Sequence, residues 1–536
     1  MSTEKEDGAV EKLMEQGNKQ IETSGDKYDE VNNLDVSDHK ETAYAGMGKE
    51  ELMKYANSPF WVRLRWLLFV IFWLTWFAML FGALFIIFMT PKCFPSTKLE
   101  WYQKSPVYVV NAASLSSQNG LDEKVQYMQT LGIENVVLSS VFNNDKGEVV
   151  DFMKVNASLG NENFLKDLIV KLKSKGMKVM LKLIPNHSST SNLFFERSVL
   201  NETMYRNYYI WNPGFSVGVH HYPINNWLSV TGKSAWTWNK ERNEFYLHQF
   251  SENEADFNFR NNDIINYFEN VFKLWLTTGV DGFYLDKVQY LFKDKEFKNS
   301  TDSSKRPTFN LSETTDLISK WGKLIENNSG ILIVSDLETN DVSGVNMVHS
   351  SITLAPDFTG EQLLNAILLK TTTFKWPSWE WVCEKNDKPN CWKNETIDAF
   401  NIISALLPGT PFINADQKLF ENNHIPNVTL FERTLKELRA MPTIEFGSFN
   451  TKLLNDTVFV FDRVMSGSES IVFAWNLSKN DTILNLNLLD EIPDEVNLSL
   501  CTRSACLLLP ALKSKVNSNK INIASESAVV LSFYKP

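Results

Sequence analysis

The stretch WLLFVIFWLTWFAMLFGALFIIFM occupies residues 66–89 and contains no charged side chain. A helix of 24 residues would extend roughly 36 Å, more than the ~30 Å hydrocarbon core of a bilayer. A buried core helix and a cleaved signal peptide are the alternatives. The signal peptide is disfavoured because the stretch begins late, runs long and lacks a small-residue cleavage site. The sequence therefore predicts one membrane-spanning helix within residues 61–90.

The residues before this helix differ in composition from those after it. Residues 1–58 hold 14 acidic and 7 basic side chains, a net charge of −7, with little apolar clustering. Such a segment cannot bury enough apolar surface to offset the entropy lost on ordering. We expect residues 1–60 to be a disordered acidic tail and residues 91–104 to be a neck leading to a larger region. The net charge of −11 for the whole chain argues against a nucleic-acid partner.

The orientation in the membrane is indicated by the N-x-S/T sequons. Lys and Arg flank both ends of the helix, so the positive-inside bias is weak. All of the sequons follow the helix. This distribution predicts a single-pass type II protein with a cytosolic N-terminus and a glycosylated outer region. The predicted glycan sites are Asn156, Asn201, Asn299, Asn310, Asn394, Asn427, Asn455, Asn476 and Asn497.

Five cysteines are too few for disulfides to hold this chain of 536 residues together. Cys383 and Cys391 lie eight residues apart, and Cys501 and Cys506 lie five apart, so each pair could close a small local loop. Cys93 is left over, four residues after the apolar stretch. In an oxidising compartment an odd cysteine suggests an intermolecular bond or a free thiol, and the spacing leaves both open.

One face of the predicted helix carries small residues. Thr75, Ala78 and Gly82 are spaced i, i+3 and i+7, so they lie on one side. In lipid, small residues allow another helix to approach closely, because packing rather than hydrophobicity drives association. The pattern fits a membrane partner, although chance placement would also produce it.

From about residue 105, short apolar runs alternate with amphipathic helical patterns. The helical pattern at 264–279 begins after polar residues 261–263 and ends at Gly279, which are strong start and stop signals. The alternation predicts a (β/α)8 barrel from residues 105–187 and 256–440. A Trp- and Asn-rich insert at 188–255 interrupts it, and the patterns after 440 predict an antiparallel β-sandwich domain over 441–536. The strand candidates of the barrel are 107–112, 135–142, 177–184, 282–286, 331–336 and 411–416.

Six motifs in this region resemble the alpha-amylase family of glycoside hydrolases, especially its alpha-glucosidase branch. The resemblance implies a (β/α)8 barrel with an insert after the third strand and a C-terminal β domain. It also implies a reaction that needs two carboxyl groups ~5–5.5 Å apart, one as nucleophile and one as acid/base. The motifs are IPNHSS (184–189), NNWLSVTGKSAW (225–236), YLHQF (246–250), DFNFRN (256–261), GVDGFYLD (279–286) and LPGTPFINAD (407–416).

The resemblance also assigns the positions of the active site. Asp286 stands at the nucleophile position, and Tyr284 stands where the family has an Arg. Asp336 stands at the acid/base position, where the family has a Glu one methylene longer. Glu338 would take this position if the alignment slipped by two residues.

Two further family positions have also changed. Lys182 replaces the Asp that precedes Asn186 and His187 at the third strand. The segment WPSWEWVCEKND (376–387) lacks the His-Asp pair of the third acidic position, and Asp387 would lie nearby only with an insertion. Together these changes predict a pocket without catalytic residues, metal or cofactor, in which Asp286, Asp336, Asn186, His187 and Tyr284 are relics. The sequon at Asn186 is expected to be unused because it lies in the barrel mouth.

A cytosolic tail, one anchor and such a barrel resemble the heavy subunit of heteromeric amino-acid transporters. Residues 49–66, KEELMKYANSPFWVRLRW, and TPKC (90–93) resemble its cell-surface antigen branch. The insert is more similar to the alpha-glucosidases and to the heavy chain of the cystine and basic amino-acid system.

In that transporter family the heavy subunit brings a multi-spanning light chain to the plasma membrane and stabilises it there. The resemblance implies an intersubunit disulfide at Cys93 and a light-chain helix against the small-residue face. A membrane-anchored alpha-glucosidase and a glycan-binding or adhesion module are the competing interpretations.

Overall fold

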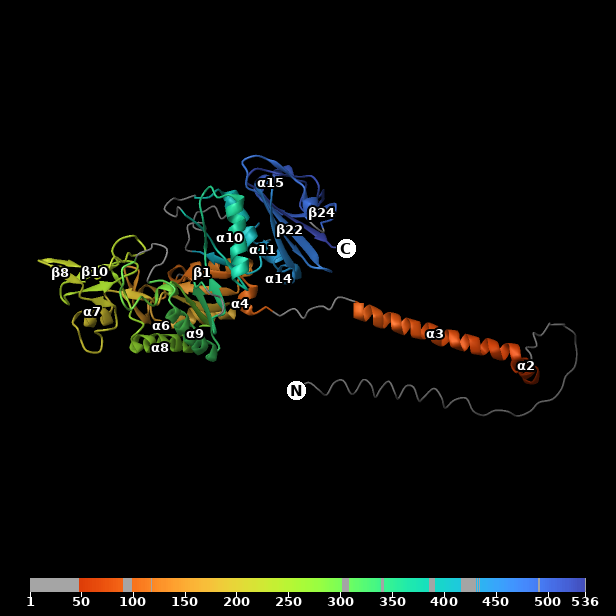
Figure 1. Cartoon of the computed structure of the whole chain (residues 1–536), viewed down its shortest axis with the longest axis horizontal. Coiled ribbons are helices and arrows are strands. Elements are labelled where there is room, and N and C mark those ends of the chain that lie inside the picture. The colour runs from red at the N-terminus through yellow and green to blue at the C-terminus, as the bar shows by residue number, and fades with distance from the viewer. Residues whose placement is uncertain are drawn as a thin grey trace. The chain divides into compact units, whose positions relative to one another are not determined.

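A computed structural model of the chain describes residues 48–89, 99–116, 118–300, 308–338, 342–384, 391–415, 430, 432, 434–489 and 492–535. The chain divides into two compact units, residues 1–95 and 96–536, which are described separately. The described part of the first unit consists of helices α2 (Lys49–Ala56) and α3 (Pro59–Met89) (Figure 1).

Helix α3 is the one helix in the described ranges that is long and apolar enough to cross a membrane. It begins at Pro59, where the fixed φ and missing N–H of proline are tolerated. Thr75 donates its hydroxyl to the carbonyls of Ile71 and Phe72, so this polar group is satisfied within the helix. The predicted apolar helix is therefore present, and its orientation remains a prediction.

The second unit is built around an eight-stranded sheet in which all paired strands run parallel (Figure 1). The last long strand pairs with the first, with Val107 opposite Phe412, so the sheet curls back on itself as a barrel requires. In order of pairing the strands are β15 (Met347–His349), β14 (Ile331–Ser335), β13 (Gly282–Leu285), β5 (Lys178–Leu183), β2 (Asn135–Ser139), β1 (Val107–Asn111), β19 (Thr410–Asn414) and β17 (Ser378–Trp379).

The predicted barrel is confirmed. The six strand candidates coincide with β1, β2, β5, β13, β14 and β19. Strands β15 and β17 were not predicted, because three and two residues are too short to show a periodic pattern.

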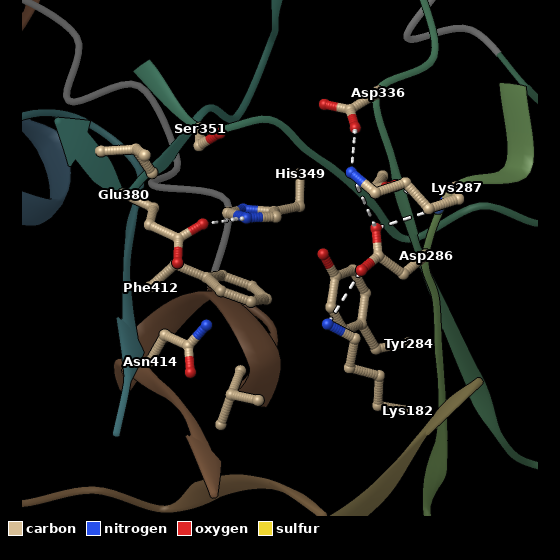
Figure 2. A pocket seen from close by; sticks show the side chains of 13 residues that line it. Lys182, Tyr284, Asp286, Lys287, Asp336, His349, Ser351, Glu380, Phe412 and Asn414 are labelled. Carbon is tan, nitrogen blue, oxygen red and sulfur yellow. Dashed lines mark hydrogen bonds and ion pairs between the residues drawn. The ribbon is translucent and has the colours of Figure 1, made fainter. Parts of the chain in front are cut away.

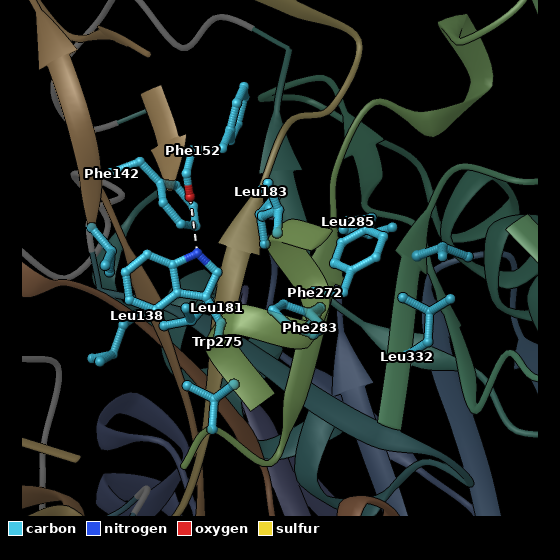
Figure 3. Packing of buried hydrophobic residues seen from close by; sticks show 14 of the residues in the cluster. Leu138, Phe142, Phe152, Leu181, Leu183, Phe272, Trp275, Phe283, Leu285 and Leu332 are labelled. Carbon is cyan, nitrogen blue, oxygen red and sulfur yellow. Dashed lines mark hydrogen bonds between the residues drawn. The ribbon is translucent and has the colours of Figure 1, made fainter. Parts of the chain in front are cut away.

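The helices that follow these strands pack against them through apolar faces. Helix α8 shows the principle: the side chain of Asn261 accepts the N–H of Asp263 at its start, and Gly279 adopts φ 106° at its end. Trp275 donates its indole N–H to the carbonyl of Phe152 at 2.9 Å within the barrel core (Figure 3). The helices are α5 (Gln118–Thr130), α6 (Glu162–Ser174), α8 (Asn262–Thr278), α9 (Ser312–Asn327), α10 (Gly360–Thr373) and α11 (Asn394–Leu406).

The insert leaves the barrel after β5 and returns before α8. Its two ends form a short antiparallel pair of β6 (His187–Ser189) and β12 (Glu254–Asp256), with His187 opposite Asp256. The bounds of the insert, 188–255, and its status as a subdomain remain predictions. Between the ends lie α7 (Leu193–Val199), the sheet of β7 (Trp211–Asn212), β10 (Trp236–Asn239) and β11 (Glu244–Leu247), and the hairpin of β8 (Phe215–Val217) and β9 (His220–Tyr222).

An antiparallel sheet follows the barrel. Phe459 and Phe461 point to a cluster that includes residues of α10 and α11, while Val458 and Val460 point to a second cluster under β23 (Thr482–Leu484) and β26 (Ile521–Ile523). The sheet lies in the same compact unit as the barrel, and a separate β-sandwich domain over 441–536 remains a prediction. Its strands are β20 (Ser448–Leu454), β21 (Val458–Val464), β22 (Glu469–Asn476), β27 (Ala528–Tyr534), β24 (Glu495–Cys501) and β25 (Lys515–Asn517).

The two predicted local disulfides, Cys383–Cys391 and Cys501–Cys506, are both present. Cys93, Asp387 and Asn427 lie outside the described residues.

At two of the predicted glycan sites the fold buries the side-chain amide. Asn476 is fully buried, and its amide donates to the carbonyls of Asn480, Ile523 and Ala524. The side-chain oxygen and nitrogen of Asn310 have no accessible surface. A sequon is defined by three residues and carries no information about packing. Of the other predicted sites, Asn201, Asn299, Asn394 and Asn455 are exposed, and Asn156 and Asn497 are half-buried.

Candidate functional site

A polar cavity of about 140 Å³ lies at the carboxyl ends of the barrel strands (Figure 2). Parallel strands bring these ends to one rim, which is where barrel enzymes hold their reactive groups. Asp286, Asp336 and Glu380 directly follow strands β13, β14 and β17, and all three line the cavity. The further lining includes Lys182, Tyr284, Lys287, His349, Phe412 and Asn414.

Asp286 is held by two lysines. One of its carboxylate oxygens lies 2.8 Å from the Lys182 ammonium and the other 4.0 Å from that of Lys287. Burial alone would raise the pKa of Asp286, but the charges of Lys182 and Lys287 outweigh it and lower that pKa to about 2. Asp286 is therefore an anion at any physiological pH.

Lys182 reaches Asp286 because β5, which carries Lys182, pairs with β13, which carries Tyr284 and ends just before Asp286. The register of β5 and β13 places Lys182 opposite Tyr284, and the ammonium lies 5.4 Å from the centre of the Tyr284 ring. Burial raises the pKa of the Tyr284 phenol well above its usual value. This phenol is therefore neutral, and the cation beside the nucleophile position comes from β5.

Lys287 bridges the two carboxylates that the resemblance assigns to catalysis. Its ammonium lies 4.0 Å from Asp286 and 3.9 Å from Asp336 (Figure 2). The backbone of Asp336 adopts φ 53° and donates its N–H to the carbonyl of His349 at 2.8 Å. Glu338, the alternative acid/base, is exposed and does not line the cavity.

A third carboxylate, that of Glu380, enters the cavity from the segment after β17, where the sequence patterns did not predict it. His349 lies 2.9 Å from Glu380 through Nε2 and 2.9 Å from the Ser378 hydroxyl through Nδ1, and its ring stacks on Phe412 at 3.7 Å. Burial would raise the pKa of Glu380, but the hydrogen bond and charge of His349 lower it. Glu380 lies within WPSWEWVCEKND (376–387), directly after two residues that the fold buries. An acidic residue at the end of such a short buried run is the one feature that could have indicated its role. The segment lacks the His-Asp pair of the family, as the sequence indicated, but it supplies the carboxylate of Glu380 to the cavity.

Asn186 and His187 do not line this cavity, contrary to the prediction. Asn186 is fully buried. Its amide donates to the Asp256 carboxylate at 2.9 Å, and its side-chain oxygen accepts from the Lys293 ammonium at 2.9 Å. Lys293 in turn pairs with Asp256 at 2.8 Å. His187 lies 3.2 Å from Glu254. These residues join the two ends of the insert instead. The expectation that the sequon at Asn186 is unused agrees with its burial.

The cavity brings together carboxylates of the kind that a retaining glycosidase uses, with a lysine beside two of them. Such an enzyme presents two carboxyl groups to one sugar, with the bond to be broken between them. Here the ammonium of Lys287 lies between Asp286 and Asp336. Among the described residues no group of three or more His, Cys, Asp or Glu is placed to hold a metal ion.

Two family models match the sequence. Residues 110–351 match the alpha amylase catalytic domain, and residues 32–108 match the solute carrier family 3 member 2 N-terminus. The second match includes the whole of α3. The chain is a relative of the amino-acid transporter heavy chains.

Curated relatives come from both branches. The human amino acid transporter heavy chain SLC3A1 is 32% identical over 277 residues, which cover 49% of this chain and 39% of the human protein. Maltase A1 of Drosophila melanogaster is 32% identical over 262 residues, 42% of this chain and 45% of the maltase. The chain thus spans less than half the length of each of these two relatives.

Solved structures support the fold. The alpha-glucosyl transfer enzyme XgtA superposes with a TM-score of 0.67 at 17% identity and covers 81% of this chain and 100% of its own. Trehalose-6-phosphate hydrolase of Bacillus licheniformis gives 0.66 at 17% identity, over 82% of this chain and 100% of its own.

Proposed function

We propose that the chain is the catalytically inactive heavy subunit of a heteromeric amino-acid transporter. The observation that carries the proposal is the match of residues 32–108 to a solute carrier N-terminus, which spans α3 and the neck. The similarity to SLC3A1 heavy chains supports it from the outer region. In this function the chain transports nothing itself and brings a light chain to the plasma membrane.

The partner is a multi-spanning light chain in the same membrane. Cys93 follows the last residue of α3 by four positions, so its thiol is tethered close to the bilayer. A disulfide there raises the effective concentration of the partner without a large interface. The face of Thr75, Ala78 and Gly82 then packs against a light-chain helix. The N-terminus is cytosolic and the barrel is extracellular and glycosylated.

The proposed inactivity rests on the cation between the carboxylates. A glycosidase transition state resembles an oxocarbenium ion, whose positive charge the nucleophile stabilises. Two unit charges 4 Å apart interact by about 4 kcal/mol at an effective dielectric of 20, which is roughly a thousandfold in rate if the charges are alike. Lys287 would impose this repulsion on a sugar bound between Asp286 and Asp336.

Non-reducing electrophoresis of membranes that express the full chain tests the covalent pairing. The wild type is expected to give a dithiothreitol-sensitive band heavier than the chain by one light chain. Cys93→Ser should lose this band, and Thr97→Ser, a neighbouring exchange that keeps the cysteine, should retain it. Absence of the band in the wild type would show that the pairing is wrong.

A membrane-anchored alpha-glucosidase is the second candidate. It is favoured by three carboxylates in one cavity, Asp286, Asp336 and Glu380, and by the similarity to Maltase A1. The side chain of Lys287 is 39% exposed, so it has room to swing outward. Release of glucose from maltose by the purified chain, lost in Asp286→Ala, would establish this activity and overturn the proposed inactivity.

A further inference from the structure

A second cavity, of about 460 Å³, lies at the amino ends of the barrel strands. Its lining includes Asn346 just before β15, Trp376 just before β17, and Gln103 on helix α4 (Trp101–Lys104), which precedes β1. Helix α14 (Pro442–Phe446) closes one side (Figure 1). Enzymes of this fold act at the opposite, carboxyl ends of the strands. This floor cavity is therefore separate from the one described above, and its volume is within the roughly 300–1,000 Å³ of small-molecule sites.

Most of the lining of the floor cavity is apolar. The indole N–H of Trp376 donates to the Thr410 hydroxyl at 2.8 Å, so the one polar atom of this ring is satisfied. Phe446 is 38% exposed, so the cavity reaches the solvent. A lining of this kind favours a ligand with an apolar group. The rings are those of Phe374, Trp376 and Phe446, and the aliphatic side chains are those of Leu99, Val345, Met347 and Val348.

The wall formed by α14 is held from behind by a buried arginine. Arg463 donates to the carbonyl of Ile444 at 2.6 Å and to that of Gly447 at 3.1 Å. These two carbonyls flank Glu445 and Phe446, the residues of α14 that line the cavity. The backbone that presents both side chains is therefore fixed before any ligand arrives, which lowers the entropy lost on binding.

Two charged side chains on the cavity wall lack partners. Lys375, which follows α10, and Glu445 both line the cavity. Neither forms a hydrogen bond or an ion pair within 4 Å with any residue that the structure describes. Glu445 attracts Arg439 at longer range, but that guanidinium donates to the carbonyls of Ala405 and Gly409 instead. One free cation and one free anion beside an apolar lining complement a ligand that carries both charges.

We propose that the floor cavity binds a small zwitterion with an apolar side chain, the chemical class of the neutral α-amino acids. The ammonium of the ligand faces Glu445, its carboxylate faces Lys375, and its side chain lies against Phe374 and Phe446. A neutral sugar would leave both charges of the wall unpaired. A phosphate group is usually held by several donors, whereas Lys375 is the one cation among the described lining residues. The proposal does not rest on the transporter function, because every lining residue belongs to this chain.

Equilibrium dialysis of radiolabelled L-leucine against the purified full chain in detergent tests this site. Lys375→Met and Glu445→Gln are each expected to weaken leucine binding roughly 10–100-fold, the effect of losing a hydrogen bond to a charged group. Both variants should keep the wild-type unfolding temperature, because neither side chain has a partner to lose. Lys298→Met is the matched control and should bind leucine like the wild type, because Lys298 is exposed, pairs with Glu296 and does not line the cavity.

Two analogues of leucine separate the roles of the two charges. 3-Methylbutylamine lacks the carboxylate and 4-methylpentanoate lacks the ammonium, so the wild type should bind both more weakly than leucine. Lys375→Met should no longer distinguish leucine from the amine, and Glu445→Gln should no longer distinguish it from the acid.

Three results would overturn the proposal. The first is equal leucine binding, or none, in the wild type and Lys375→Met. The second is displacement of leucine by glucose, which would place the ligand in the cavity around Asp286. The third is tighter binding of phosphocholine than of leucine. A light chain that co-purified would add the same binding to every variant, so these results are independent of the pairing through Cys93.

Discussion

The buried contact that joins the ends of the insert offers a quantitative test of how the outer region is stabilised. The ammonium of Lys293 lies 2.8 Å from Asp256, and the two side chains are 1% and 0% exposed. Asp256 also accepts the amide of Asn186 and the backbone N–H of Gln249. Lys293→Met removes the positive charge, keeps a similar chain length and leaves a buried carboxylate with neutral donors only.

The magnitude follows from the desolvated charge that remains. Breaking a buried ion pair by removing one partner costs about 3–5 kcal/mol. Residues 96–536 form one compact unit. With about 2.1 cal/mol/K of unfolding entropy per residue, this cost lowers the unfolding midpoint by roughly 3–5 °C if the unit unfolds as a whole. The insert is expected to become sensitive to protease first, because Asp256 lies on β12 at its root.

Thermal unfolding of the full chain in detergent, with limited proteolysis, measures both effects. Lys298→Met is the control, because Lys298 is exposed and pairs with the exposed Glu296, so no measurable shift is expected. The double variant Lys293→Met/Asp256→Asn should recover part of the loss, since no charge then remains buried. A wild-type midpoint for Lys293→Met, or a double variant no better than the single one, would refute the reasoning.

Three further outcomes are expected. Burial, followed by the charge of Glu395, raises the pKa of Asp398 to about 7, above its unfolded value, so ionisation costs stability as the pH rises. The gain in unfolding temperature from Asp398→Asn should therefore grow between about pH 4 and pH 8, while the exposed Asp167→Asn should give none. Asn201→Gln should lower the electrophoretic mass of the expressed chain by one glycan, and any shift for Asn476→Gln would contradict the burial of that side chain. Gly409→Ala should lower the unfolding temperature by several degrees, because Gly409 has φ +125° and a Cβ would lie 2.2 Å from the Pro377 carbonyl oxygen. Gly467→Ala, also at positive φ but in open space, should lower the unfolding temperature less.

Sequence patterns predicted those parts of the fold that repeat or extend over many residues. The helix α8 was predicted within two residues, because Asn261 and Gly279 act through local backbone geometry. The strands β15 and β17 escaped prediction because their three and two residues are fixed by neighbours in the barrel. Asn476 shows the same limit for glycosylation, since the carbonyls that it binds at Ile523 and Ala524 lie far along the chain.

The sequence motifs predicted those cavity residues that lie on or directly after the central strands β5 and β13. Asp286, Tyr284 and Lys182 lie on or beside β13 and β5, and all three line the cavity. His349 and Glu380 were missed because neither motif nor spacing links two residues that meet through the short strands β15 and β17. Asn186 and His187 were misplaced because the motif identifies the strand end, not the direction in which each side chain points.

Two substitutions, one on β5 and one on β13, explain why Asp286 remains ionised in a site that has changed so much. The resemblance implies an Asp at position 182 and an Arg at 284, whereas this chain has Lys182 and Tyr284. These positions are opposite each other in the strand register, so the positive charge has moved across one strand and still lies 2.8 Å from Asp286. A buried carboxylate needs such a cation whether or not it performs chemistry, because an unpaired charge would destabilise the barrel. The pair of Lys182 and Asp286 therefore serves the stability of the fold without requiring a substrate.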